Sequence, residues 1–237
     1  DTMTLSDNAS IQSSGHLTIA PMTDGLETQS ISLGFESAGG RSDLNLTDSE
    51  LATIQPGFAS ITLGTSGLAD NRNLVTVESL HLLSASTIIG GTINDALGTD
   101  FDVSSTTLTG TIDASVLRAS GDVVLAANST FLIDVAGIQP GEDARQYDQL
   151  VAAGKVDIQA GAELDVNRVI SWRPQGGEQI TIVQRTGGSG TFGGLAEGAV
   201  LPNFLNATIS YVGGDGDDIV LTLPTTLPAF STSVNLG

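Results

Sequence analysis

Three aspartates lie close together in one glycine-rich stretch, YVGGDGDDIVLTL (residues 211–223), at positions Asp215, Asp217 and Asp218. Residues 213–221 match the nonapeptide pattern G-G-x-G-x-D-x-U-x, which binds calcium in repeated arrays, at every fixed position. Carboxylate and carbonyl oxygens are the ligands that Ca²⁺ prefers in proteins. The three aspartates are therefore candidate ligands of a weak calcium site.

The surroundings of this stretch favour a turn over a metal site. The nonapeptides on either side, FLNATISYV and TLPTTLPAF, do not repeat the pattern, although such sites form between consecutive repeats. The pattern also needs Val220 to point inward, whereas Ile219 and Leu221 lie on the more apolar face of the strand. Because Asp-Gly is a strong turn signal, we expect ATISYV and DDIVLTL to form a hairpin.

Two other patterns suggest chemistry but lack the context that the chemistry needs. The segment GSGTFG (188–193) matches G-x-G-x-x-G, yet Gly198 and Pro202 follow it where a dinucleotide site requires a helix. His16 and His81 lie in Ser/Thr-rich, strand-like segments without a nucleophile motif, and we expect both to face solvent. The sequence therefore predicts no catalytic and no cofactor-binding residues.

Asp165, Arg168 and Arg173 raise an enzymatic alternative. Polysaccharide lyases and hydrolases with a β-helical fold place carboxylates and basic residues on one exposed sheet face, and these three residues are near enough in sequence to share such a cleft. The chain has only eight Lys and Arg residues, spread along its length. A cluster of carboxylates with Arg or Lys on one exposed face would support this alternative, because fold alone does not settle function.

Composition excludes several classes of partner. The 237 residues carry 27 acidic and 8 basic side chains, a net charge of −19, although only 15% of the residues are charged. Such a surface repels nucleic acid and anionic lipid. No apolar run approaches the roughly 18 residues of a membrane span, so we expect no direct membrane insertion. The absence of Cys excludes disulfides and thiolate metal sites.

Short alternating runs predict an all-β protein. Phe131, Ile133 and Val135 share one strand face, with the period of two that strands with one buried side show. Helical signal is confined to LTDSELATIQPG (46–57), where Thr47 precedes Glu50 in capping-box spacing. The predicted strands lie in the runs 15–20, 29–34, 59–64, 106–112, 121–127, 129–135, 154–160, 162–166, 178–184, 207–212 and 218–223.

Many short strands joined by polar turns suit a solenoid, a sandwich or a barrel. The low aromatic content of 4% and the small side chains favour a thin stacked core, and Gly, Asn and Asp stand at nearly every corner. With coils of about 20 residues, the chain would form about ten of them. We expect a right-handed parallel β-helix, with a β-sandwich as the alternative.

Several segments resemble a known family of surface proteins. DLNLTDSELATIQPGFASITLG (43–64) is similar to a recurrent segment of filamentous-haemagglutinin-like exoproteins. GDVVLAANSTFLIDVAG, YDQLVAAGKVDIQAGAELDV, GEQITIVQRTGGSGTFGGLAEGAVL and ATISYVGGDGDDIVLTL resemble, in that order, the C-terminal part of autotransporter-type passengers. In the family these segments form the β-helical stalk of secreted adhesins. The resemblance implies an extracellular location and a structural or adhesive role, and it implies no catalytic residues.

We therefore expect a non-enzymatic, extracellular module of a bacterial cell-surface protein. Residues 1–223 are expected to form one β-helical domain, a rigid and soluble rod. The tail 224–237, with Pro224 and Pro228 followed by the strand-like AFSTSVNL, is a candidate docking strand for self-association into filaments. A cell-surface or glycan ligand is the other expected partner. The opening residues DTMTLSDNAS carry no signal peptide and suggest a processed chain or a segment of a longer one.

Overall fold

A computed structural model describes residues 10–21, 30–35, 44–64, 74–95, 101–140 and 146–228. Within these ranges the protein is nearly all β, and its one helix is the single turn α1 (Asp48–Leu51). The strands of the N-terminal half are β1 (His16–Ile19), β2 (Ser30–Leu33), β3 (Leu44–Leu46), β4 (Ser60–Gly64), β5 (Leu74–Val77), β6 (Ser79–Leu80), β7 (Ser86–Asp95), β8 (Phe101–Val103), β9 (Thr106–Asp113) and β10 (Val116–Ala119).

The C-terminal half continues in the same style, with short strands separated by turns. Its strands are β11 (Val123–Leu125), β12 (Thr130–Val135), β13 (Gln139–Pro140), β14 (Gln146–Tyr147), β15 (Gln149–Ala152), β16 (Val156–Ile158), β17 (Glu163–Arg168), β18 (Gln179–Gln184), β19 (Val200–Leu201), β20 (Ala207–Gly213) and β21 (Asp218–Thr222). The all-β prediction is confirmed. The described residues contain no helix long and apolar enough to cross a membrane.

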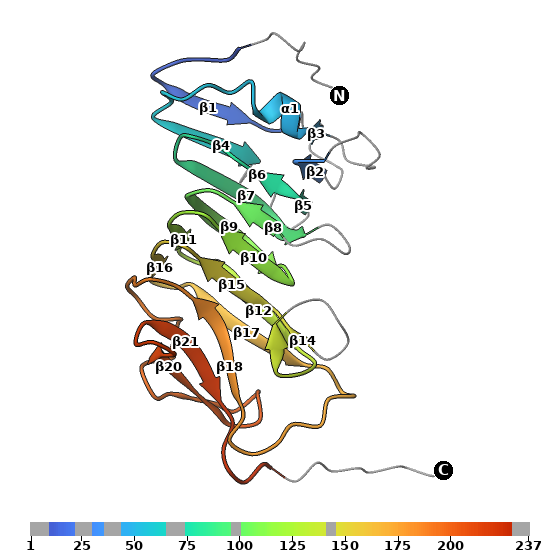
Figure 1. Ribbon diagram of the computed structural model, residues 1–237, viewed down its shortest axis with the longest axis vertical. Coiled ribbons are helices and arrows are strands. Elements are labelled where there is room, and N and C mark those ends of the chain that lie inside the picture. The colour runs from blue at the N-terminus through green and yellow to red at the C-terminus, as the bar shows by residue number, and fades with distance from the viewer. Residues whose placement is uncertain are drawn as a thin grey trace, which may run out of the picture.

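The strands form two mixed sheets, one of 13 strands and one of eight. Most neighbouring strands are parallel and come from successive segments of the chain, as in the ladder that runs β1, β4, β7, β9, β11, β16. Figure 1 shows these strands stacked one above another along the longest axis, from β1 at one end to β20 and β21 at the other. The described antiparallel pairs join β12 to β14 and link β18, β19, β20 and β21.

The parallel register stacks the apolar positions of successive strands into columns. In one column, each residue is the direct register partner of the next, and none is more than 4% exposed: Leu63, Ile88, Leu108, Leu125 and Ile158. A second column contains Val75, Ile93, Ile112, Phe131 and Leu164. A one-residue slip would turn a whole strand inside out, so these columns fix the register.

The strands β7 and β9 bend together where the register shifts between Ile89 and Thr92. Gly110 adopts a φ of +89° there, and a Cβ atom on it would lie 1.9 Å from the carbonyl oxygen of Gly90. Glycine is therefore the residue that lets the two backbones approach at this bend.

The helix prediction for 46–57 is also confirmed. Thr47 is the N-cap of α1, and its side chain accepts the Glu50 N–H at 3.3 Å while the Glu50 carboxylate accepts the Thr47 N–H at 3.0 Å. The helix ends after one turn and buries only Leu51. Local signals of this kind depend on neighbours in sequence and are therefore readable before the fold is known.

Candidate functional site

The three aspartates of the nonapeptide gather in the turn between β20 and β21. One ligand oxygen from each of Asp215, Asp217 and Asp218 lies within 4.8 Å of the other two. The predicted hairpin is confirmed, because Gly213 pairs with Asp218 and the Gly216 N–H donates to the Gly213 carbonyl at 2.8 Å. The same loop therefore forms the turn of a hairpin and brings three carboxylates together.

The sequence correctly placed Ile219 and Leu221 on one face of the strand and Val220 on the other, but the face of Val220 is buried as well. Ile219 and Leu221 are fully buried, and Val220, on the opposite face, is also only 5% exposed. A Cβ atom on Gly213 would lie 2.4 Å from the Val220 Cγ2 atom, so the absence of a side chain at Gly213 leaves room for Val220. The strand β21 is therefore packed on both faces.

A buried arginine, Arg185, forms hydrogen bonds with the turn. Its Nε donates to the Asp217 carbonyl at 2.6 Å and its Nη1 to the Val156 carbonyl at 2.8 Å. Its backbone N–H donates to the Asp218 Oδ1 atom at 3.1 Å, and the residue is only 6% exposed. Arg185 therefore ties the hairpin to β16 through backbone groups, a role that no sequence motif marked.

The pKa values of two aspartates in this loop are raised, for different reasons. The pKa of Asp217 is raised chiefly because the Asp215 carboxyl is close enough to share a hydrogen bond with it. The pKa of Asp218 is raised by burial, which the hydrogen bond from the Arg185 N–H opposes. A bound cation would relieve both effects, so Asp215, Asp217 and Asp218 stay candidate calcium ligands.

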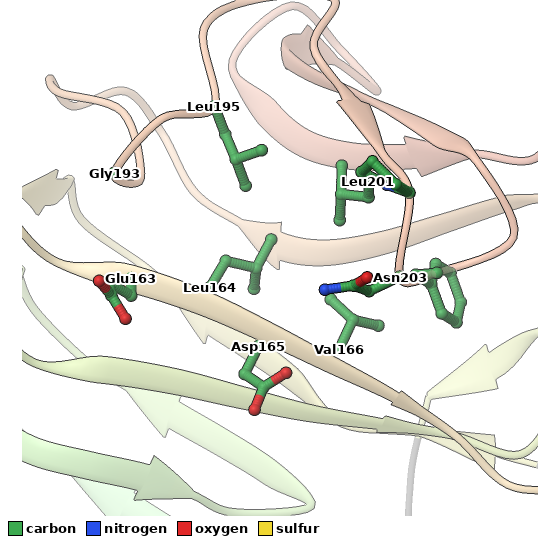
Figure 2. Close-up of a pocket in the computed structure, with 10 residues that line it drawn as sticks. Glu163, Leu164, Asp165, Val166, Gly193, Leu195, Leu201 and Asn203 are labelled. Carbon is green, nitrogen blue, oxygen red and sulfur yellow. The ribbon is translucent and has the colours of Figure 1, made fainter.

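A hollow of about 250 Å³ lies along the outer edge of β17 (Figure 2). Figure 2 shows Leu164 of β17 pointing toward Leu195, while the Asp165 side chain extends from the other side of the strand. The loop after β19 closes the hollow. The lining residues are Glu163, Leu164, Asp165, Val166, Gly193, Leu195, Leu201, Pro202, Asn203 and Phe204.

The trio Asp165, Arg168 and Arg173 does not gather around one hollow. Asp165 lines the hollow beside β17, whereas the Arg168 Nη1 atom donates to the Trp172 carbonyl at 3.4 Å. The Arg173 Nη1 atom donates to the Ile170 carbonyl at 2.7 Å. The two arginines thus hold the turn that follows β17.

Carboxylates and arginines meet instead in a groove of about 410 Å³ on the eight-stranded sheet. Asp102 of β8 is the register partner of Arg118 of β10, and Arg185 and Asp215 line the same groove. Each of these residues comes from a different segment, so their meeting depends on the strand order and not on sequence spacing.

A cluster of four aspartates, Asp95, Asp113, Asp134 and Asp148, lies near the ends of β7, β9 and β12. Burial chiefly, together with the nearby carboxylates of Asp134, Asp113 and Asp95, raises the pKa of Asp148 to about 7, although the hydrogen bond from the Asp134 N–H acts in the opposite direction. The Asp148 Oδ2 atom accepts the Asp134 N–H at 2.7 Å. Sequence reasoning missed this cluster, because its members come from segments distant in sequence.

The remaining predicted positions have structural surroundings. The His16 Nδ1 atom and the Ser60 Oγ atom form a hydrogen bond at 2.7 Å, and His81 is exposed. The glycine-rich segment 188–193 runs beside β16, where the Ile158 N–H donates to the Ser189 carbonyl at 2.8 Å. A helix does not follow this segment in the described part of the chain.

Comparison with known proteins identifies no relative: no family model, no curated protein and no solved structure matches the chain.

Proposed function

We propose that this chain is a non-enzymatic, extracellular rod segment of a bacterial surface protein, with residues 1–223 wound as a right-handed parallel β-helix. The observation that carries the proposal is the continuous parallel ladder from β1 to β16, in which each strand pairs with a strand from the following segment. Buried columns such as Leu63, Ile88 and Leu108 give such a stack a one-dimensional core.

The mechanism of a rod is mechanical. Every backbone hydrogen bond in the ladder lies between neighbouring strands, so bending the rod strains many bonds at once. The net charge of −19 keeps the surface hydrated and discourages side-by-side aggregation of copies. The resemblance of 43–64 and of the later segments to stalks of secreted adhesins supports an extracellular, adhesive setting for this rod.

Electron microscopy of the purified protein tests the rod. We expect elongated particles whose length matches one chain or an end-to-end series of chains. Compact, round particles would contradict the proposal. Immunogold labelling of the source cells tests the location separately, because label inside the cell would remove the surface role and leave the rod shape untouched.

The rival is a β-helical carbohydrate-active enzyme, and the groove with Asp102, Arg118 and Asp215 favours it. Two carboxylates flanking basic residues suit proton transfer on an acidic polysaccharide. The test incubates the protein with a panel of uronic-acid-containing and neutral polysaccharides and measures new reducing ends and unsaturated products. Activity that Asp102→Asn abolishes and Asp165→Asn leaves intact would establish the rival; we expect no product.

A further inference from the structure

The strand β17 has one paired edge and one open edge within the described residues. Its partner is β12. The Glu163 N–H donates to the Ser129 carbonyl at 2.8 Å, and the Val169 N–H donates to the Val135 carbonyl at 2.9 Å. Backbone groups alternate in direction along a strand, so the N–H and C=O groups of Leu164 and Val166 point away from β12. Neither residue has a described backbone partner there.

The pairing on this side of the sheet stops just before the open edge. The segment 187–193 runs alongside β16, with the Val156 N–H donating to the Gly187 carbonyl at 3.0 Å. Its last bond is from the Gly193 N–H to the Ala162 carbonyl at 2.7 Å, and the chain then turns away. The open edge is thus a continuation of an existing ladder and presents a template for one more strand.

The hollow of Figure 2 lies along this open edge and has two different sides. Leu164 is the last residue of the buried column that contains Ile112 and Phe131. Those two side chains are buried, whereas the Leu164 side chain is only partly buried. On the outer side the carboxylates of Glu163 and Asp165 are exposed. A strand added here would need apolar side chains facing Leu164 and neutral, hydrogen-donating side chains facing the carboxylates.

The chain itself contains a segment with this pattern. Asp218 is the last charged side chain of the sequence, so nothing beyond it is repelled by an acidic surface. In AFSTSVNLG (229–237), which lies outside the described residues, larger and β-branched residues alternate with small polar ones. Phe230, Thr232, Val234 and Leu236 share one face, and Ser231, Ser233 and Asn235 share the other.

We propose that residues 229–237 of one copy add as a strand to the open edge of β17 in a second copy. Their apolar face covers Leu164 and fills the hollow beside Leu195, and the hydroxyl and amide groups of their polar face donate to Glu163 and Asp165. Pro228 lacks an N–H and restricts Leu227 to extended backbone, which disfavours a tight turn at the start of this segment. This inference gives a partner and a site to the self-association in the proposed function and rests on it.

Cross-linking tests the contact directly, because the chain has no cysteine. One copy carries Leu195→Cys, the other carries Val234→Cys, and the mixture is oxidised mildly and run on a non-reducing gel. We expect a disulfide-linked heterodimer, and none when Leu83→Cys, at a leucine that is 82% exposed elsewhere, replaces Leu195→Cys. A double variant that closes the disulfide only within one chain would overturn the proposal, as would the absence of any cross-link.

Sedimentation of the full chain over a dilution series gives the energetic test. Val234→Asp is expected to weaken association at least about tenfold, since a carboxylate would enter an apolar and acidic site, whereas Ser233→Ala has a small effect. Equal association of the wild type and Val234→Asp would contradict the proposal. Both substitutions lie outside the described residues, so Val234→Asp particles that remain rod-shaped and still associate like the wild type would refute this site while leaving the rod intact.

Discussion

The parallel ladder from β4 to β16 contains a buried column that is aliphatic throughout, whereas the core of the C-terminal block around β18 to β21 also contains pairs of aromatic rings. The ladder column Leu63, Ile88 and Leu108 is fully buried without a ring. In the block, the ring of Phe192 lies 6.4 Å from that of Tyr211. The Trp172 and Phe204 rings lie 6.3 Å apart.

The difference shows how a repeating core is brought to an end. A parallel ladder offers each strand the same surface that it received, so it has no intrinsic stop. The antiparallel pairs of β18, β20 and β21 break that repetition, and large rings fill the space that a further aliphatic layer would occupy. The variants below test whether the block protects the ladder or folds independently of it.

The largest effect is expected where the two regions meet. The Phe192 ring stacks on Phe131 of β12, with centroids 6.3 Å apart, and is 1% exposed. Phe192→Ala should lower the free energy of unfolding by about 3–5 kcal/mol, through lost burial and a cavity. Val212→Ala, at a side chain that is 64% exposed, should change it by less than about 0.5 kcal/mol. Equal urea midpoints for the two variants would refute this role.

The next effect compares a glycine of the ladder with a glycine of the block. Gly110→Ala places a Cβ atom 1.9 Å from the Gly90 carbonyl oxygen and strains a φ of +89°. Its expected cost is about 3 kcal/mol, because backbone must move as well. Gly216→Ala strains a φ of +120° but meets nothing within 4 Å, so about 1 kcal/mol is expected. Thermal unfolding measures both, and a costlier Gly216→Ala would reverse the comparison.

The aspartate cluster around Asp148 predicts that the stability of the fold depends on pH. Because the pKa of Asp148 is raised to about 7, the folded chain binds its proton more tightly than the unfolded chain. The free energy of unfolding should therefore fall as the pH rises from about 4 to about 7, by about 2 kcal/mol after allowance for partial exposure. Asp148→Asn should flatten this part of the profile, measured by urea unfolding at several pH values. An unchanged profile would show that Asp148 does not cause the pH dependence of stability.

The smallest expected effect concerns calcium at the turn of the block. For a dissociation constant of about 1 mM, addition of about 5 mM Ca²⁺ would stabilise the fold by about 1 kcal/mol. The rise in Tm relative to EDTA should disappear in Asp215→Asn and persist in Asp165→Asn, which removes an exposed carboxylate elsewhere. No rise in the wild type would end the calcium hypothesis and leave the turn held by its own backbone hydrogen bonds and by Arg185.

Part of the local structure was predictable from the sequence, although the predicted runs did not include β7 at the centre of the ladder. The period of two in TFLIDV placed Phe131, Ile133 and Val135 on the buried face of β12, where they are at most 1% exposed. The pair Thr47 and Glu50 marked the start of α1. Each of these signals depends on side chains within a few residues of one another, so no knowledge of distant contacts is needed.

The candidate sites were predictable only where they are local. The carboxylates of Asp215, Asp217 and Asp218 share one turn, so their proximity followed from spacing. The role of Arg185 did not, because its carbonyl partners belong to β16, β20 and the turn itself. The three residues of the enzymatic alternative, Asp165, Arg168 and Arg173, do not form one cluster, because the turn after β17 directs both guanidinium groups to nearby carbonyls.

By itself, the sequence determined the all-β class and some of the strands, where the single helical turn begins and where the last hairpin turns, because alternation, capping and turn chemistry act between near neighbours. Only the tertiary structure decided which strands are parallel partners, that Leu164 ends a buried column at an open edge, and that Asp134 and Asp148 meet. Those contacts join segments far apart in the chain, and their register is set by the shared packing of whole columns, which no local pattern encodes.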